Sequence, residues 1–311
     1  MEFFHKVPHI NFLGVRKLAM GMSVVVLLIA IASLFVNKLN FGVDFTGGVT
    51  VQVAYPKAAD LGQVRSALTA GGFADAVAQN FGTPQEVLIR LRQEQNETDK
   101  DAGAKVLAAL QKAEPAVKLE QVNFVGPEVG QDLAWKGSVA FGVTLLGILL
   151  YIIFRFEWRL AAGAVAATLH DVVFVVGVFS LFHIEFDLNV LAAVLAVMGY
   201  SVNDTVVVFD RIREDFRKMR KGTPIEIMNA AINETLSRTI MTSGVTLLVV
   251  IALLALGGPI LHGFSLALFV GIIVGTYSSI YIASATALML GVSKSDLMPT
   301  RKEGQPVDDM P

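Results

Sequence analysis

Apolar residues gather in six long runs along the chain, and each run is long enough to cross the hydrocarbon core of a bilayer as a helix. A stretch of about a hundred residues separates the first run from the second, and in it apolar and polar residues alternate at short intervals. The runs cover residues of about 18–36, 134–154, 160–182, 188–208, 239–257 and 264–290. The pattern predicts six transmembrane helices and one domain outside the membrane.

The stretch between the first two runs has the pattern of a small α+β domain. Residues 49–53, 76–80, 86–92 and 117–124 are predicted strands, and residues 60–70 and 99–112 are predicted helices. The order β-α-β-β-α-β is that of the ferredoxin-like split unit. Its acidic residues are scattered and it contains no histidine, so we interpret the domain as a binding or structural module.

Basic residues mark alternate connections between the runs. Lys and Arg occur in the leader before the first run, in residues 155–159, in residues 209–237 and after the sixth run, whereas residues 183–187 and 257–263 contain neither. Because basic connections stay in the cytoplasm, we expect both termini to be cytoplasmic and the domain to be periplasmic. The predicted parts are a leader over 1–17, a first helix over 18–37, a domain over 38–133, five helices over 134–290 and a tail over 291–311.

The connection over 209–237 is amphipathic. Ile212, Phe216 and Met219 share one helical face among basic residues, which predicts either a helix lying in the membrane interface or a solvated helix that packs on a soluble partner. Thr223-Pro-Ile-Glu226 has the pattern of a capping box that begins the next helix.

The composition agrees with a polytopic membrane protein and narrows its chemistry. Hydrophobic residues make up 54% of the chain and charged residues 17%, against roughly a quarter charged in soluble domains. The net charge of −2 does not indicate nucleic-acid binding, and the absence of cysteine excludes disulfides, thiolate metal sites and thiol nucleophiles. We expect no metal, no cofactor and no enzymatic activity.

A charged residue interrupts the fourth apolar run. Asp204, next to Asn203, falls where a carboxylate costs about 2.5–3.5 kcal/mol at a helix centre, so it is a candidate functional residue. Arg238 and Thr242 lie at the start of the fifth run, at a compatible depth. A paired Asp204 stays ionised, whereas an unpaired one favours its neutral form, so a movable Arg238 would make Asp204 a proton carrier. The structural alternatives are an interfacial or packing role for Asp204 and snorkelling of Arg238 to the headgroups.

A second polar pair, His170-Asp171, falls near the middle of the third run. Adjacent positions do not share a helix face, so we expect at most one of the two to point into the bundle. The structural alternative for His170 is a hydrogen bond between helices.

The segment before the domain is Phe41-Gly-Val-Asp-Phe-Thr-Gly-Gly48. Gly47 and Gly48 permit positive φ and close backbone approach, and Asp44 or Thr46 can satisfy local backbone donors. The sequence lacks a phosphate-binding frame, so we interpret the segment, with Gly42, Asp44, Phe45, Gly47 and Gly48, as a rigid junction.

Several segments together resemble the SecF family, the smaller subunits of the SecD–SecF accessory complex of the bacterial Sec translocase, within the RND superfamily. They are Gly42-Val-Asp-Phe-Thr-Gly-Gly48, Leu169-His-Asp171, Gly199-Tyr-Ser-Val-Asn-Asp-Thr-Val-Val-Val-Phe-Asp-Arg211, Thr235-Leu-Ser-Arg-Thr239 and Val274-Gly-Thr-Tyr-Ser-Ser-Ile280. The resemblance is close to full length and implies half of an RND-type bundle with a periplasmic ferredoxin-like domain. It also implies that Asp204 and Arg238 belong to a proton pathway, with Thr242 nearby.

The resemblance further implies partners and a task. A SecD-like subunit would complete a heterodimer, and the pair would use the proton motive force with a SecYEG-type translocon to drive late steps of export of an unfolded preprotein across the inner membrane. Other hypotheses are half of an RND-type small-molecule exporter, an intramembrane aspartyl protease using Asp171 and Asp204, and a passive assembly scaffold. The single small domain argues against the exporter, and Gly-Tyr-Ser-Val-Asn-Asp204 does not match the Gly-x-Gly-Asp of such proteases.

Overall fold

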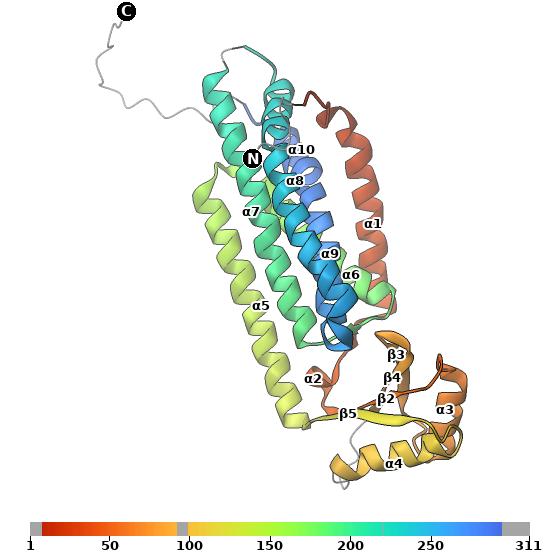
Figure 1. Ribbon diagram of the computed structural model, residues 1–311. Helices are drawn as coiled ribbons and strands as arrows, with labels where there is room; N and C mark the ends of the chain where they lie inside the picture. The colour runs from red at the N-terminus through yellow and green to blue at the C-terminus, as the bar shows by residue number, and fades with distance from the viewer. Residues whose placement is uncertain (1–7, 92–98, 220, 294–311) are drawn as a thin grey trace, which may run out of the picture.

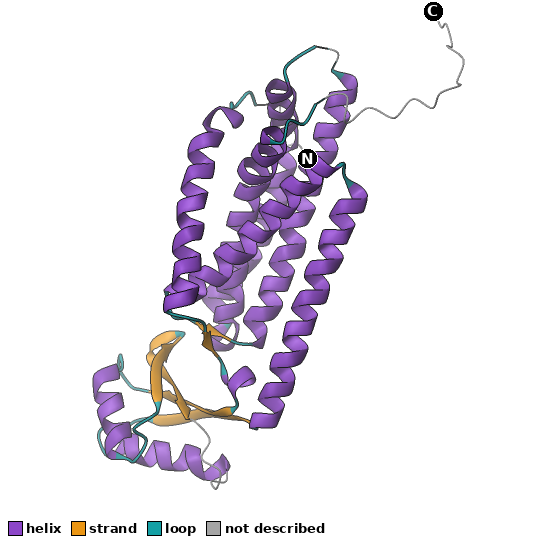
Figure 2. Ribbon diagram, turned by 180° about the vertical axis from the view of Figure 1, so that it is seen from behind, coloured by secondary structure: helices purple, strands orange, loops and turns teal. Residues whose placement is uncertain are grey.

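A computed structural model describes residues 8–91, 99–219 and 221–293. It contains a bundle of long helices, with the small α+β domain hanging from one end of that bundle (Figures 1 and 2). Among the described residues, six helical segments are long and apolar enough to cross a membrane. Residues 1–7 of the predicted leader and 294–311 of the predicted tail lie outside the described residues.

The long helices cover the six apolar runs and extend beyond several of them. Their bounds are α1 Arg16–Val36, α5 Pro127–Arg155, α6 Trp158–Leu181, α7 Leu188–Lys218, α8 Pro224–Leu256 and α9 Gly258–Ser278, the last continued by the π-helical turn η2 Ser279–Ala283 and by α10 Ser284–Met289. A 3₁₀ turn, Leu13–Val15, precedes α1. Helices α6, α7 and α9 form the buried centre, and α5 is mostly exposed along its outer side (Figure 1).

The domain has the predicted ferredoxin-like topology. Its sheet has the antiparallel order β3-β4-β2-β5, built from β2 Gly48–Ala54, β3 Val77–Phe81, β4 Thr83–Leu91 and β5 Lys118–Val125. Helices α3 Leu61–Ala70 and α4 Asp99–Gln111 pack on this sheet, and Val51, Val64 and Val106 lie in their shared core. Asp60 caps α3 by accepting a hydrogen bond from the backbone N–H of Gly62 at 2.8 Å. The fold class predicted from the sequence is therefore confirmed.

The junction motif forms a short turn of helix between the bundle and the domain. Strand β1 Asn40–Phe41 pairs in parallel with β6 Glu185–Phe186, which lies in the α6–α7 connection, and α2 Val43–Thr46 follows at once. Gly47 has φ +70°, and a Cβ there would lie 2.8 Å from Cα of Pro127 at the start of α5, so only glycine fits this approach. Asp44 does not satisfy a local donor. Its Oδ2 accepts from the backbone N–H of Leu188, at the start of α7, at 3.1 Å.

The amphipathic segment after the fourth span does not lie in the membrane interface. It continues α7 without a break, and Ile212 and Phe216 are buried in the same core as Leu13, Ile227 and Met228. A face that is already covered by its own chain cannot insert among headgroups, so the interfacial interpretation is wrong. The predicted capping box is present: Thr223 Oγ1 accepts from the N–H of Glu226, whose carboxylate accepts from the N–H of Thr223.

Candidate functional site in the membrane bundle

Asp204 lies on α7 and faces the interior of the bundle. It is 4% exposed, and its Oδ2 accepts a hydrogen bond from Ser279 Oγ at 3.0 Å. Ser279 begins the π-helical turn η2, which carries its hydroxyl to α7 from the last helix. Single π-helical turns are frequent at functional sites because they change which residues face a neighbouring helix.

Asp171 is a second buried carboxylate, and it has more hydrogen-bond partners than Asp204. It is fully buried, and its Oδ2 accepts from Ser201 Oγ at 2.5 Å and from Ser278 Oγ at 2.6 Å. Its Oδ1 lies 2.8 Å from Nδ1 of His170. His170 is 5% exposed, so the expectation that at most one of the pair points inward is wrong. The reason is that α6 is enclosed by α1, α7 and α9, so that adjacent positions are both covered.

Consecutive serines connect the two acids. Ser278, the last residue of α9, donates to Asp171, and Ser279 donates to Asp204. Ser201 belongs to the same helix as Asp204, one turn before it, yet donates to Asp171. The arrangement brings two carboxylates and three serine hydroxyls together where α6, α7 and the last helix meet. Such a cluster is chemically suited to holding or passing a proton.

Two further hydroxyls line the bundle near Asp204. Thr205 and Thr239 are almost fully buried; the Thr239 hydroxyl interacts with the Asp204 carboxylate, whereas Oγ1 of Thr205 has no hydrogen-bond partner among the described residues. Buried polar groups are normally satisfied, so the unpaired hydroxyl of Thr205 next to a buried acid marks a place where a hydrogen bond can be formed. Sequence reasoning did not select Ser278, Ser279, Thr205 or Thr239 individually. The signal available was the hydroxyl-rich Gly-Thr-Tyr-Ser-Ser279 segment, in which two acids could have been matched to two serines.

Three predicted site residues lie on the outside of this chain. Arg238, Thr242 and Asn203 are exposed. Thr242 Oγ1 donates within its own helix to the carbonyl of Arg238 at 3.1 Å. No ion pair joins Asp204 and Arg238 among the described side chains, although Arg238 is near enough to act on the carboxylate through space. In this state the two charges are therefore separated.

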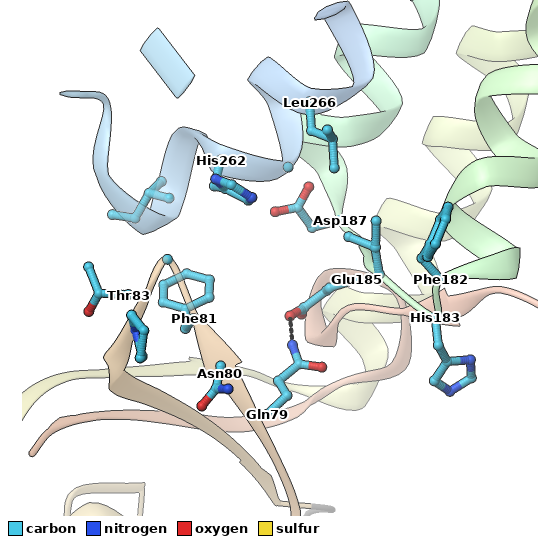
Figure 3. A pocket seen from close by; sticks show the side chains of 15 residues that line it. Gln79, Asn80, Phe81, Thr83, Phe182, His183, Glu185, Asp187, His262 and Leu266 are labelled. Carbon is cyan, nitrogen blue, oxygen red and sulfur yellow. Dashed lines mark hydrogen bonds between the residues drawn. The ribbon is translucent and has the colours of Figure 1, made fainter. Parts of the chain in front are cut away.

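A cavity of about 520 Å³ separates the domain from the bundle (Figure 3). The β3–β4 hairpin, the α6–α7 connection and the start of α9 line it, and Glu185, Asp187, His183 and His262 are among its titratable residues. Burial raises the pKa of the Glu185 carboxyl above its usual range, against the opposing effect of Arg90. Burial likewise raises the pKa of the Asp187 carboxyl, although Asp187 caps α7 by accepting from the N–H of Val190. Within the described part of the chain, no three His, Cys, Asp or Glu residues are grouped as metal ligands would be.

The fold agrees with comparisons with known families. Residues 105–293 match the family described as protein export membrane protein SecD/SecF, C-terminal, and residues 32–58 match the SecD/SecF GG motif. The second match includes the Gly47-Gly48 junction. The chain is thus a membrane protein of the SecD/SecF export class.

Individual relatives narrow the class. The chain is 51% identical to the protein translocase subunit SecF of Vibrio alginolyticus over 305 residues, which cover 97% of each chain. It is 47% identical to the SecF subunit of Pseudomonas aeruginosa, covering 98% of this chain and 99% of that one. The chain belongs to the SecF family of protein translocase subunits, which makes it a multi-pass inner-membrane protein.

A solved structure of a longer protein contains the same fold. The crystal structure of SecDF from Thermus thermophilus, described as a translocon-associated membrane protein, superimposes with a TM-score of 0.82 at 37% identity. The match covers 91% of this chain but 39% of that one. The rest of the SecDF chain corresponds to what a SecD partner would supply.

Proposed function

We propose that this chain and a SecD-like partner use the proton motive force to drive late steps of preprotein export through a SecYEG-type translocon. The observation that carries the proposal is Asp204, a carboxylate buried within a membrane span and bonded to one serine hydroxyl. An acid within a membrane span is costly, and such acids mark ion pathways and proton relays. The chain has no enzymatic role in this proposal.

The exposed polar residues of the bundle support a heterodimer. Asn203, Arg238 and Thr242 are exposed on this chain, and a charged or amide side chain facing lipid at this depth is unfavourable. A SecD-like half packed on this face would cover them and complete an RND-type bundle. Arg238 would then approach Asp204 in one state and leave it in another, and the carboxylate would gain or lose its proton accordingly.

The distribution of basic residues supports the orientation in the proposal. Arg155, Arg159, Arg211 and Arg213 lie at the end of the bundle opposite the ferredoxin-like domain. By the positive-inside rule this end is cytoplasmic, so both termini are cytoplasmic and the domain is periplasmic. The domain is then on the side where a preprotein emerges.

The test is export of an unfolded preprotein into vesicles that contain the chain, the SecD-like partner and the translocon, with and without an imposed proton gradient. Asp204→Asn should reduce gradient-stimulated export to the level without a gradient, and Asp204→Glu should retain part of the stimulation. Asp210→Asn is the matched control. Asp210 lies on the same helix as Asp204, but it is nearer the cytoplasmic end, where it pairs with Arg155 at 2.7 Å. This variant should export like the wild type.

The gradient should be imposed with protons and, separately, with sodium ions, since a carboxylate can serve either. If only a sodium gradient stimulated export, sodium would be the coupling ion in place of the proton. Wild-type stimulation in Asp204→Asn, with normal assembly, would favour the passive scaffold instead.

A further inference from the structure

The guanidinium of Arg90 lies where three parts of the chain meet. Arg90 belongs to β4 of the domain, and its Nη1 donates to Oδ1 of Asn40 at 3.1 Å and to the carbonyl oxygen of Phe41 at 2.9 Å. Both acceptors belong to β1, the strand that leaves the first transmembrane helix. The planar fork of Arg can bind several acceptors at once with fixed geometry.

The other side of the same guanidinium binds the bundle. Arg90 Nη2 lies 3.1 Å from Oε2 of Glu185 in the α6–α7 connection, and the two side chains are 12% and 17% exposed. Gln79, from the neighbouring strand β3, donates to the same Oε2 at 3.0 Å (Figure 3). A half-buried, charge-assisted contact of this kind is stronger than an exposed ion pair.

Glu185 is in turn fixed to the start of α7. Strand β6, which contains Glu185, ends two residues before α7 begins, and Asp44 and Asp187 accept from the N–H groups of its first turn. Phe45 stacks on Phe186 with ring centroids 6.3 Å apart. Helix α7 then runs without interruption to Asp204. A displacement of α7 at the level of Asp204 therefore displaces Glu185 as well.

The cavity beside this contact leaves room for the domain to move. The turn of the β3–β4 hairpin and the start of α9 face each other across about 520 Å³ (Figure 3). The covalent connections of the domain are Gly47, which leads into β2, and Gly126, which follows β5, and these two strands are neighbours in the sheet. Both connections belong to the β2–β5 half of the sheet, whereas Arg90 on β4 and Gln79 on β3 contact Glu185 from the other half. This contact therefore restrains the half of the domain that the covalent connections do not hold.

We propose that Arg90 is a positioning residue that transmits movement of α7 to the ferredoxin-like domain through Glu185. This inference rests on the proposed function, because it assigns the contact through which a change at Asp204 becomes a movement outside the membrane. Arg90 does not belong to the ion path itself. Removing it should uncouple export from ion flow while leaving the flow intact.

The experiment uses the complete chain with its SecD-like partner and translocon in vesicles, and it measures proton flux and preprotein export in the same preparation. Arg90→Gln should keep the flux of the wild type within about twofold and lose gradient-stimulated export. Arg90→Lys should restore part of the stimulation, because it keeps a cation that can donate to Glu185 and to the oxygens of Asn40 and Phe41. Asp204→Asn should lose both flux and export.

A distance measurement adds a readout that does not depend on export. The chain contains no cysteine, so spin labels at Thr83→Cys and His262→Cys report the width of the cavity alone. Without a gradient, the wild type should give a narrow distance distribution and Arg90→Gln a broad one, and Arg90→Lys should narrow it again. With a gradient, the wild-type mean should shift and that of Arg90→Gln should not.

The outcomes separate the two proposals. If Arg90→Gln exports like the wild type, or loses flux together with export, the transmission role is wrong. If the wild type itself shows neither proton flux nor gradient-stimulated export, the proposed function fails. The distance measurement then tests the Arg90–Glu185 contact by itself. An unchanged narrow distance distribution in Arg90→Gln would then overturn the inference. A broad distribution in Arg90→Gln that becomes narrow in Arg90→Lys would show that the contact holds the domain in place.

Discussion

A close contact between two helices of the bundle gives a sharp prediction about packing. Helices α7 and α9 meet at Gly271, where an added Cβ would lie 2.6 Å from Cγ1 of Val197 and closer still to its Cγ2. Val197 is 1% exposed and branched at Cβ, so it has neither space nor an alternative rotamer to yield. We predict that Gly271→Ala forces the two helices apart.

The magnitude follows from the overlap. Inserting one methyl group into a filled core costs about 1–3 kcal/mol, which lowers the folding equilibrium constant about 5- to 150-fold. The opposing effect is the gain in helix propensity from Gly to Ala, roughly 1 kcal/mol in water. Gly199→Ala on α7 isolates that gain, since no heavy atom lies within 4 Å of its added Cβ. The difference in stability between the two variants is therefore the steric cost alone, and the net effect of Gly271→Ala is that cost less the gain in propensity.

Reversible unfolding in mixed micelles, followed by tryptophan fluorescence, measures this difference. Gly271→Ala should unfold at lower denaturant than the wild type, and Gly199→Ala at the same or higher denaturant. Adding Val197→Ala to Gly271→Ala should recover part of the loss, because it removes the overlapping methyl groups. Equal midpoints for the two glycine variants would refute the packing argument.

Two further predictions concern the other acids. Asp171→Leu should destabilise the protein more than Asp171→Asn, because leucine leaves the buried hydroxyl of Ser201 without an acceptor, at about 1–3 kcal/mol, and leaves Ser278 only the carbonyl of Gly275. Equal melting temperatures would show that the acid is not structurally required. Because the folded protein raises the pKa of Asp187, it binds that proton more tightly than the unfolded chain does, so the contribution to stability falls as pH rises from the usual carboxyl range through the raised pKa. Relative to Asp187→Asn, which keeps the cap, the wild type should gain melting temperature as pH is lowered through this window, and parallel pH curves would contradict the assignment.

The elements that the sequence could predict are those set by local periodicity. The six spans and the βαββαβ order follow from runs and alternation of apolar residues. Asp204 is conspicuous because a charge within an apolar run has a high energetic cost. The ends of the helices were harder to predict. Helix α7 continues past Arg211 because it packs there against Leu13 and Met228, which are far away in the sequence.

The site was predictable only in part, because its hydrogen bonds depend on helix phase. Ser278 and Ser279 look alike in the sequence, and the π-helical turn determines that one serves Asp171 and the other Asp204. The inward position of both His170 and Asp171 depends on how many neighbours surround α6, which one helix pattern cannot reveal. Arg90 and Glu185 come from separate folding units, so no local signal links them.

The pairing of β1 with β6 also sets an order of events during synthesis. The ferredoxin-like domain is complete once β5 has emerged, but Glu185 emerges only after α5 and α6. At roughly 5–20 residues per second, the ribosome needs about 3–12 s to make that intervening stretch. During that time the folded domain is held by its two covalent connections alone, because Asn40 and Phe41 have no β6 strand to pair with. Docking onto the bundle is therefore a separate, late step of biogenesis, and it coincides with the arrival of the helix that carries Asp204.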